Sequence, residues 1–375
     1  MLINKNTFSI GIVIHDFVFG GSERIAIRLA NYWAHQGHPV VIFAGAGEGE
    51  MRNLLEPTVR LVIAPDPVCR SASSMRHLAR LAAHYFQQNP VNACFVPGNY
   101  HWPVAYQLGK LPARIRPVIL TQISSPIYKP GRSAWAQKIF NARMRFLLRK
   151  SDKLIALDCT TAAEANSLFR RAVAEVIPLP ALCSTLPTPK MPKKACLNIL
   201  AAGRLTHAKG FDLLISAFAA VAKKYPAATL TICGAGPDYQ ALLDLAARNG
   251  VQDKVRLTGY VTDIRPYLDD ARLFVLSSRR EGYGAVILEA LAAGRQVITT
   301  ACTPAARDFV SCSEAVHVVP VGDCSALARA MCGVLGTPAP DSQRLANAVR
   351  PFFIDAGGQA YLFLMSDLLE KARQN

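Results

Sequence analysis

Apolar residues along the chain fall into two patterns, short continuous runs and longer stretches with helical spacing. The runs that predict buried strands are at 9–14, 40–44, 93–96, 117–120, 154–157, 197–202, 229–233, 273–276 and 297–300. Helical spacing lies between them, as where Ile25, Leu29 and Trp33 recur every four residues. Strands that alternate with helices in this way predict an α/β fold with doubly wound parallel sheets.

A Pro-, Thr- and Lys-rich segment, C-S-T-L-P-T-P-K-M-P-K-K, interrupts this alternation from Cys183 to Lys194. Such a composition is typical of an exposed linker. We therefore expect a first domain over 1–182, a linker over 183–196 and a second domain over 197–354. With 375 residues, each domain is large enough for a hydrophobic core of its own. A final helical pattern covers 355–373.

One stretch of the second half, from Ser277 to Thr300, combines a tight turn with two carboxylates. Gly282 and Gly284 permit the turn, a helical pattern follows, and Glu281 and Glu289 flank its start. A helix N-terminus carries about half a positive charge and attracts phosphate. Carboxylates beside a bound diphosphate would repel it unless they accept hydrogen bonds from neutral hydroxyls. A nucleotide sugar offers this combination, although two solvated glutamates on a buried helix fit the spacing equally well.

Two cations follow the strand expected at 197–202. Gly203 gives the turn, and Arg204 and Lys209 then stand at the carboxyl end of the strand, where open α/β sheets bind ligands. Arg binds phosphate through two parallel hydrogen bonds and Lys binds it as a point charge. Two surface cations with no ligand remain the alternative from the residues alone.

These two stretches resemble a known family. E-G-Y-G-x4-E-A-L-A-A-G is similar to the donor-site signature of family 4 retaining glycosyltransferases, and G-R-L-x4-K-G is similar to the family's second signature. The family usually has Pro where this chain has Gln296. The resemblance implies the GT-B fold, in which two Rossmann-like domains face a cleft and the last helix packs back on the first domain.

The resemblance also implies roles for individual residues. Arg204, Lys209 and the amides around Gly284 and Ala285 would neutralise the leaving diphosphate. Glu281 would hold hydroxyls of the donor sugar, and Glu289 would accept hydrogen bonds from the ribose. The other positions implied in donor binding are Gly20, Gly21, Gly203, Gly234, Tyr260, Val261, Gly282 and Tyr283.

In the first half the chain departs from the family. Many members have a histidine near the turn T-Q-I-S-S-P-I-Y, where this chain has none. His15, His101 and Ser124 are therefore the candidates for a contact with the sugar or the acceptor. A lone histidine is more often a structural residue of the core or the surface.

The net charge of +16 indicates an anionic partner. Between Lys110 and Lys153 lie eleven Lys and Arg residues and one acid, Asp152. Part of this region, R-S-A-W-A-Q-K-I-F-N-A-R-M-R-F-L-L-R-K, predicts a basic helix with aromatics. Such a helix suits an anionic membrane surface or a phosphorylated lipid, or is an amphipathic helix with a solvated basic face.

No apolar run is long enough to cross a bilayer, and the N-terminus lacks a secretory cleavage site. We therefore expect a cytoplasmic protein at the inner face of the plasma membrane. The ten cysteines form no C-x-x-C pair, which predicts buried, inert thiols and no metal site. The expected co-substrate is a nucleotide sugar, a UDP-sugar first of all.

The sequence thus predicts a retaining, metal-independent glycosyltransferase that transfers a hexose to a glycan or lipid-linked acceptor of the bacterial envelope, such as lipopolysaccharide. A sugar-nucleotide 2-epimerase of the same fold would need acids and histidines that the first half offers sparingly. A nucleic-acid-binding protein would explain the charge, but no reading module or stacking platform is apparent, so nucleic acid is not an expected partner. A non-catalytic relative that binds sugar nucleotides is the third alternative.

Overall fold

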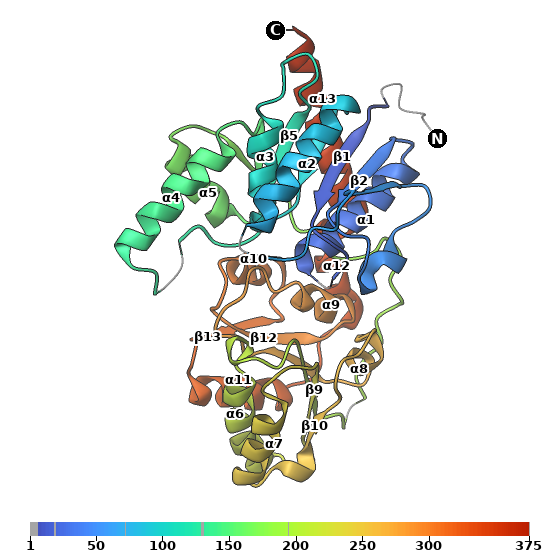
Figure 1. The fold of residues 1–375 in the computed structure, drawn as a ribbon. Coiled ribbons are helices and arrows are strands. Elements are labelled where there is room, and N and C mark those ends of the chain that lie inside the picture. The colour runs from blue at the N-terminus through green and yellow to red at the C-terminus, as the bar shows by residue number, and fades with distance from the viewer. Residues whose placement is uncertain (1–6, 19, 72, 129–130, 194, 375) are drawn as a thin grey trace. The chain divides into compact units, whose positions relative to one another are not determined.

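The computed structural model describes residues 7–18, 20–71, 73–128, 131–193 and 195–374. Lys194 of the expected linker lies outside these residues. The chain forms two compact units, unit 1 with residues 1–181 and 353–375 and unit 2 with residues 182–352. Each unit is built on one parallel sheet (Figure 1), which confirms the predicted fold class.

The sheet of unit 1 has seven strands in the order β3-β2-β1-β4-β5-β6-β7. They are β1 (Ile10–Ile14), β2 (Val40–Ala44), β3 (Arg60–Ile63), β4 (Ala93–Val96), β5 (Val118–Ile123), β6 (Lys153–Ala156) and β7 (Ala174–Val176). The four central strands β2, β1, β4 and β5 are buried along their whole length, as expected for a parallel sheet covered on both faces. Strand order reverses between β1 and β4, and the loops that follow such a reversal are where open α/β sheets bind ligands.

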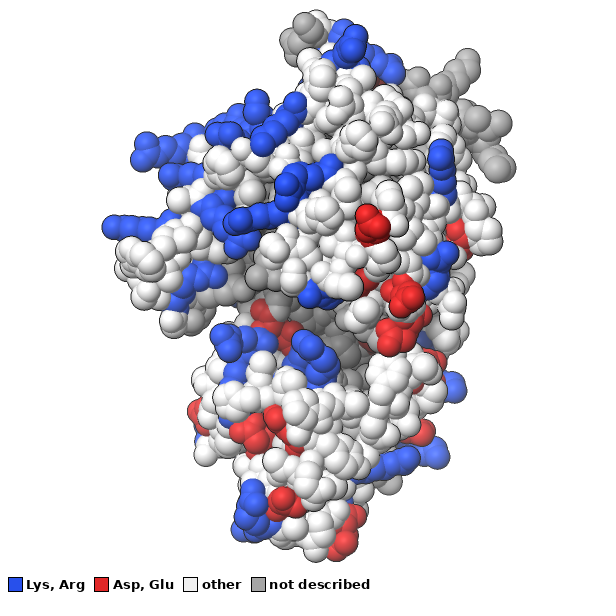
Figure 2. Space-filling model, in the orientation of Figure 1, with Lys and Arg blue, Asp and Glu red and all other residues white. Residues whose placement is uncertain are grey.

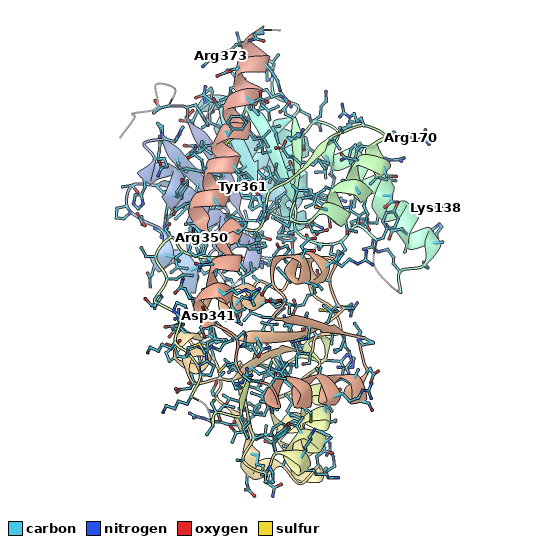
Figure 3. The ribbon with its side chains drawn as sticks, turned by 180° about the vertical axis from the view of Figure 1, so that it is seen from behind. Lys138, Arg170, Asp341, Arg350, Tyr361 and Arg373 are labelled. Carbon is cyan, nitrogen blue, oxygen red and sulfur yellow. The ribbon has the colours of Figure 1, made fainter. Side chains whose placement is uncertain are left out.

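Helices cover both faces of this sheet. They are α1 (Gly21–His35), α2 (Ser74–Gln88), α3 (Trp102–Leu108), α4 (Ala134–Leu148), α5 (Cys159–Phe169) and α13 (Ile354–Gln374), with 3₁₀ turns η1 (Glu50–Leu54) and η2 (Asn99–His101). Helices α2 to α5 share one apolar cluster with the strands. On the opposite face α1 contacts α13, and the ring of Phe95 lies 5.8 Å from Trp33 and 5.1 Å from Tyr361. Figure 3 shows Tyr361 on α13, which runs along unit 1.

The sheet of unit 2 has six parallel strands in the order β10-β9-β8-β11-β12-β13. They are β8 (Asn198–Ala202), β9 (Thr229–Cys233), β10 (Val255–Leu257), β11 (Leu273–Leu276), β12 (Gln296–Thr300) and β13 (Val316–Val319). Here strand order reverses between β8 and β11, where Ile199 lies beside Leu273. The loops that follow these two strands carry both motifs that resemble the family's donor site.

The helices of unit 2 are α6 (Phe211–Lys224), α7 (Tyr239–Arg248), α8 (Arg265–Asp269), α9 (Val286–Ala292), α10 (Ala305–Cys312), α11 (Cys324–Leu335) and α12 (Ser342–Ala348). Three 3₁₀ turns join them, η3 (His207–Lys209), η4 (Gln252–Lys254) and η5 (Arg350–Phe352). Helices α6, α7 and α11 share the main apolar cluster with the sheet. Helix α9 contacts β11, β12 and α12.

The segment predicted as a linker is exposed for much of its length, yet it is attached to unit 2. The buried guanidinium of Arg295 donates hydrogen bonds to the carbonyls of Lys190, Ala293 and Ala271. Arg265 donates to the carbonyl of Thr188 at 2.9 Å. These bonds satisfy main-chain acceptors in a segment too rich in proline for regular structure.

The structure differs from the prediction at the segment that follows Leu120. The segment T-Q-I-S-S was predicted as a turn, but β5 continues through Thr121 and Gln122 to Ile123. Both polar side chains are buried and bonded, Thr121 Oγ1 to Ser151 Oγ at 2.8 Å and Gln122 Nε2 to the hydroxyl of Tyr361 at 3.3 Å. Satisfied polar groups can occupy a buried strand at little cost.

The nine cysteines whose side chains the structure describes are free, but not all are buried. Cys69, Cys159 and Cys183 are exposed, so the prediction of buried thiols is wrong for these three. Cys94 is fully buried in β4, and burial raises the pKa of its thiol. The cysteines therefore give no sign of a disulfide framework within the described part of the chain.

Helix α4 is the amphipathic helix predicted from the basic region. Trp135, Ile139 and Phe146 are exposed on it, Trp135 to 73%. Lys and Arg side chains gather over the part of unit 1 that α4 and α5 occupy (Figure 2). None of the helices in the described residues combines the length and apolarity needed to cross a bilayer.

Candidate functional site

The loops after β8 and β9 meet through glycines. The N–H of Gly203 donates to the carbonyl of Cys233 at 2.9 Å, and the N–H of Leu205 donates to that of Ala235 at 2.9 Å. Gly234 has φ +154°, and a Cβ there would lie 1.8 Å from the carbonyl oxygen of Gly203. Only glycine allows this approach, which holds Gly203 and the exposed side chain of Arg204 at the carboxyl end of β8.

An ion pair joins the two motifs. Lys209 Nζ lies 2.5 Å from Glu281 Oε1, although the residues are 72 positions apart in the chain. Ser278 Oγ donates to the same oxygen at 2.8 Å. Both side chains are largely buried, with 23% of Lys209 and 11% of Glu281 exposed. The pair is therefore partly shielded from water, and its geometry is fixed from both loops.

A second ion pair joins the loop after β11 to the first turn of α6, the helix that follows Lys209. The guanidinium of Arg279 donates to both carboxylate oxygens of Asp212 at 2.7 and 2.6 Å. This hydrogen bonding lowers the pKa of Asp212 below its ordinary value, despite partial burial. The main-chain N–H of Arg279 also donates to the carbonyl of Ala208 at 2.8 Å. The loop that carries Glu281 is thus bonded to the turn that carries Lys209.

The residues after Glu281 form the turn into α9. Gly282 is exposed, and its carbonyl accepts a hydrogen bond from Thr303 Oγ1 at 3.1 Å. The Tyr283 ring is buried edge-on to Phe309, with centroids 5.3 Å apart. Gly284 has φ +88°, and Ala285 caps the helix. Tyr283 therefore packs into unit 2 rather than pointing freely into solvent.

Glu289 lies in the first turn of α9, which has only seven residues. Its side chain is half-buried. Tyr260 and Val261 follow Gly259, whose carbonyl accepts a hydrogen bond from the N–H of Gly234 at 2.8 Å. This bond ties the loop that bears Tyr260, which is exposed, to the glycine turn after β9.

In unit 1, His15 belongs to a buried polar network at the end of β1. Its Nδ1 lies 3.0 Å from Asp16 Oδ2 and its Nε2 lies 3.0 Å from Ser74 Oγ. Arg70 binds both oxygens of Asp16, at 2.6 and 2.8 Å, and reaches Glu23 at 3.2 Å. Burial alone would raise the pKa of Asp16, but the hydrogen bonds and charge of Arg70 outweigh it and hold the pKa below its ordinary value.

The sequence did not predict this network. Asp16, Glu23, Arg70, Ser74 and Tyr100 were not among the candidates, and the first half was judged to be sparing in acids and histidines. The structure gathers two carboxylates, two histidines and an arginine around the ends of β1 and β4. An acid two residues after a buried strand, in I-V-I-H-D, is the signal that could have indicated it.

His101 is the second histidine of this region and is fully buried. Its Nδ1 lies 2.6 Å from the carbonyl of Pro97, and its Nε2 has no hydrogen-bond partner within the described residues. Burial lowers the pKa of His101 to about 4, so the ring is neutral at pH 7. The neighbouring His15 and Arg70 also lower the pKa of His101, whereas Asp16 raises it.

The substitution His101→Gln is expected to flatten the pH dependence of stability between pH 6.5 and 5. In this pH range His101 is protonated in the unfolded chain but stays neutral in the folded protein. A lower pH therefore favours unfolding. In the wild type this residue lowers the free energy of unfolding by about 2 kcal/mol at pH 5 relative to pH 7. Urea unfolding of both proteins at the two pH values measures this change. The variant retains His38, so the contribution of His38 cancels in the comparison. Equal losses in both proteins would contradict this prediction.

The remaining candidates of unit 1 lie near the same edge. Gly20 immediately precedes α1, and a Cβ there would meet the Glu23 carboxylate, whereas Gly21 faces open space. Ser124 Oγ accepts from the N–H of Asn99 at 3.2 Å, and it would lie 3.0 Å from a Cβ on Gly98. Ser124 is thus occupied in holding the loop after β4.

No group of three or more His, Cys, Asp or Glu side chains in the described part of the chain could hold a metal ion. The charged groups that the structure assembles around the candidate residues include the Lys209–Glu281 and Arg279–Asp212 pairs in unit 2 and the Asp16–Arg70–Glu23 network in unit 1. Such an arrangement can bind an anion and orient hydroxyl groups by charged hydrogen bonds.

Solved structures define the class of the fold. The chain resembles the crystal structure of Anabaena Alr3699/HepE in complex with UDP and glucose, with a TM-score of 0.72 and 17% identity, over 96% of this chain and 100% of that one. At this identity the similarity shows the fold, and that fold is GT-B.

Two family models match the chain. The model described as glycosyl transferase 4-like domain matches residues 20–180, and the model described as glycosyl transferases group 1 matches residues 196–337. The chain therefore belongs to the family 4-like glycosyltransferases of the GT-B fold.

Curated relatives match shorter stretches. The lipopolysaccharide core biosynthesis glycosyltransferase LpsE of Rhizobium meliloti is 35% identical over 133 residues, 36% of this chain and 38% of that protein. Glycogen synthase of Mycobacterium tuberculosis is 31% identical over 210 residues, 55% of this chain and 50% of that protein. The chain thus spans about half the length, or less, of these relatives.

Proposed function

We propose that this protein is a retaining glycosyltransferase that moves a sugar from a nucleotide-sugar donor to a hydroxyl of a glycan or glycolipid. The observation that carries the proposal is the Lys209–Glu281 pair at 2.5 Å, at the carboxyl ends of β8 and β11 where the strand order reverses. The ammonium group of Lys209 suits the donor's diphosphate, and the carboxylate of Glu281 suits the hydroxyls of the donor sugar.

The hydrogen bonds of the pair leave capacity for both tasks. Glu281 uses Oε1 for Lys209 and Ser278, which leaves Oε2 to accept a hydrogen bond from a hydroxyl of the donor sugar. Lys209 gives one N–H to Glu281 and can turn the other two toward phosphate oxygens. The exposed Arg204 adds a guanidinium that binds phosphate through two hydrogen bonds.

In the proposed reaction the bond between the anomeric carbon and the phosphate oxygen breaks, and the diphosphate leaves with the electron pair. Lys209, Arg204 and the amides near Gly284 and Ala285 stabilise its negative charge. The acceptor hydroxyl forms the new bond on the same face, and its proton passes to an oxygen of the leaving diphosphate. Glu281 favours the positive character that develops at the anomeric carbon, and Glu289 holds the ribose hydroxyls.

We propose a UDP-sugar as the donor, used without a metal ion. The fixed cations of Lys209 and Arg204 would take the part that a divalent cation plays at other diphosphate sites. The structural neighbour from Anabaena was crystallised with UDP and glucose, which supports the choice of nucleotide. Tyr260 and Val261 would border the base.

For the acceptor, we propose a lipid-linked glycan or lipopolysaccharide at the inner face of the plasma membrane of a bacterium. The relative LpsE supports this choice by its name. Exposed Trp135, Ile139 and Phe146 lie on basic helix α4, a pattern suited to an anionic bilayer surface. Cosedimentation with vesicles that contain phosphatidylglycerol tests the membrane contact.

A panel of UDP-, GDP- and ADP-sugars with EDTA present tests the donor and the reaction. At a concentration about one hundred times Kd, the right donor should raise the unfolding temperature by roughly 5 °C. Labelled sugar should then pass to lipopolysaccharide or a lipid-linked acceptor. Binding that needs a divalent cation would refute the metal-free mechanism, and an epimerised donor without transfer would refute the proposed activity.

A further inference from the structure

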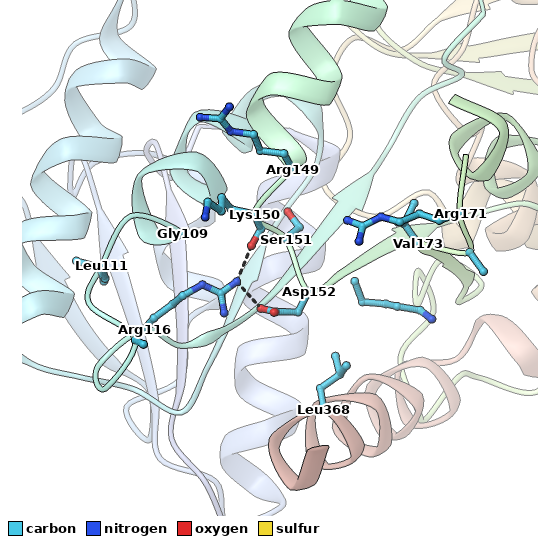
Figure 4. Close-up of a pocket in the computed structure, with 13 residues that line it drawn as sticks. Gly109, Leu111, Arg116, Arg149, Lys150, Ser151, Asp152, Arg171, Val173 and Leu368 are labelled. Atoms are coloured by element: carbon cyan, nitrogen blue, oxygen red, sulfur yellow. Dashed lines mark hydrogen bonds and ion pairs between the residues drawn. The ribbon is translucent and has the colours of Figure 1, made fainter. Parts of the chain in front are cut away.

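A hollow of about 620 Å³ lies at the amino-terminal edge of the unit 1 sheet (Figure 4). The loops that enter β5, β6 and β7 line it, together with Leu368 of α13. In a parallel sheet these loops stand at the edge opposite the carboxyl ends. The hollow is therefore on the other edge of this sheet from the network of His15 and Asp16.

The lining of this hollow is strongly basic. Its five cations are Arg116, Arg149, Lys150, Lys153 and Arg171, and Asp152 is its one carboxylate. Asp152 is already engaged, because it accepts from Arg116 at 2.9 Å and from the N–H of Ile119 at 2.7 Å. Arg116 and Lys153 form ion pairs with Asp152 and Glu175. The other three cations repel each other, so an anion that fills the space is favoured.

Two of the guanidinium groups are held in place before any ligand binds. Arg116 donates to the carbonyl of Lys150 at 2.6 Å as well as to Asp152, and Arg149 lies over the ring of Phe146 at 4.7 Å. Arg116 and Arg171 extend toward Ser151 and Asp152 from opposite sides (Figure 4). Fixed arginines lose little entropy when they bind, and their planar forks match the oxygens of a phosphate group.

Other cations remain available for a ligand. Within the described residues, neither Lys150 nor Arg171 makes an ion pair through its side chain, and both are exposed. A second hollow of about 270 Å³ shares Arg116 and adds Arg114 and Arg373. The positive surface thus continues beyond a single phosphate, which suits a ligand with more than one negative charge.

We propose that this hollow is a second anion site, which binds a phosphomonoester or diphosphate group of a soluble compound or a lipid headgroup. It lies in unit 1, whereas the proposed donor site is formed by residues of unit 2. The proposal therefore stands whether or not the protein transfers sugars.

Calorimetric titration of the full chain with inorganic pyrophosphate tests the site. The background is Lys209→Ala, which removes a cation from the proposed donor site of unit 2. Adding Lys150→Gln and Arg171→Gln should weaken pyrophosphate binding about a hundredfold, since a charged hydrogen bond is worth about tenfold in affinity. Both side chains are exposed, so the variant should fold normally. The matched control adds Lys223→Gln and Arg248→Gln, which remove the same charge from exposed positions of unit 2.

Affinity that is unchanged by Lys150→Gln and Arg171→Gln would overturn the proposal. An equal loss in the control would also overturn it, because net charge alone would then explain the binding. Vesicles of phosphatidylcholine with and without phosphatidic acid distinguish the sources of the phosphate. Vesicle binding that depends on Lys150 and Arg171 identifies a headgroup, whereas loss of pyrophosphate binding alone identifies a soluble ligand.

Discussion

Replacing Lys209 with alanine is expected to lower kcat/KM for sugar transfer by about a thousandfold. The ammonium group would meet the diphosphate as its negative charge develops, and removing one fixed donor of this kind costs 10²–10³ in rate. The same change leaves the Glu281 carboxylate without its ion-pair partner in a largely buried position. Glu281→Gln should cause a loss of similar size, because an amide cannot stabilise positive charge at the anomeric carbon.

Initial rates with the donor chosen from the nucleotide-sugar panel measure both losses. Lys223→Ala is the matched control, since this lysine is exposed near the end of α6, the helix that begins just after Lys209. Thermal unfolding of each variant separates loss of function from loss of fold. Near-normal rates for Lys209→Ala would remove this residue from the site and with it the main support for the proposed reaction.

The sequence predicted the central strands of both sheets well, because continuous apolar runs leave few alternatives to a buried strand. Short edge strands were not predicted. Strands β3 and β7 have four and three residues and are largely exposed, so their pattern differs little from that of a loop. Their pairing with β2 and β6 comes from tertiary structure, which local sequence does not encode.

The candidate site was predicted unevenly for a related reason. In unit 2, family resemblance supplied Lys209 and Glu281, and the structure adds that they are in direct contact. In unit 1, Arg70 and Asp16 lie 54 positions apart, and no periodicity links two loops that meet only when the sheet forms. Spacing reveals neighbours on one helix or strand, whereas ion pairs between loops depend on the order of strands.

Replacing Gly234 with alanine is expected to destabilise unit 2 by about 3 kcal/mol and to weaken donor binding at least tenfold. The new Cβ would lie 1.8 Å from the carbonyl oxygen of Gly203, and the residue has φ +154°, which disfavours any side chain. Gly203 would have to move, and Arg204 moves with it. Urea unfolding and calorimetry with the donor measure the two effects. Gly333→Ala in α11 is the control, because a Cβ there meets nothing within 4 Å. If both variants bind donor alike, the glycine contact does not position Arg204.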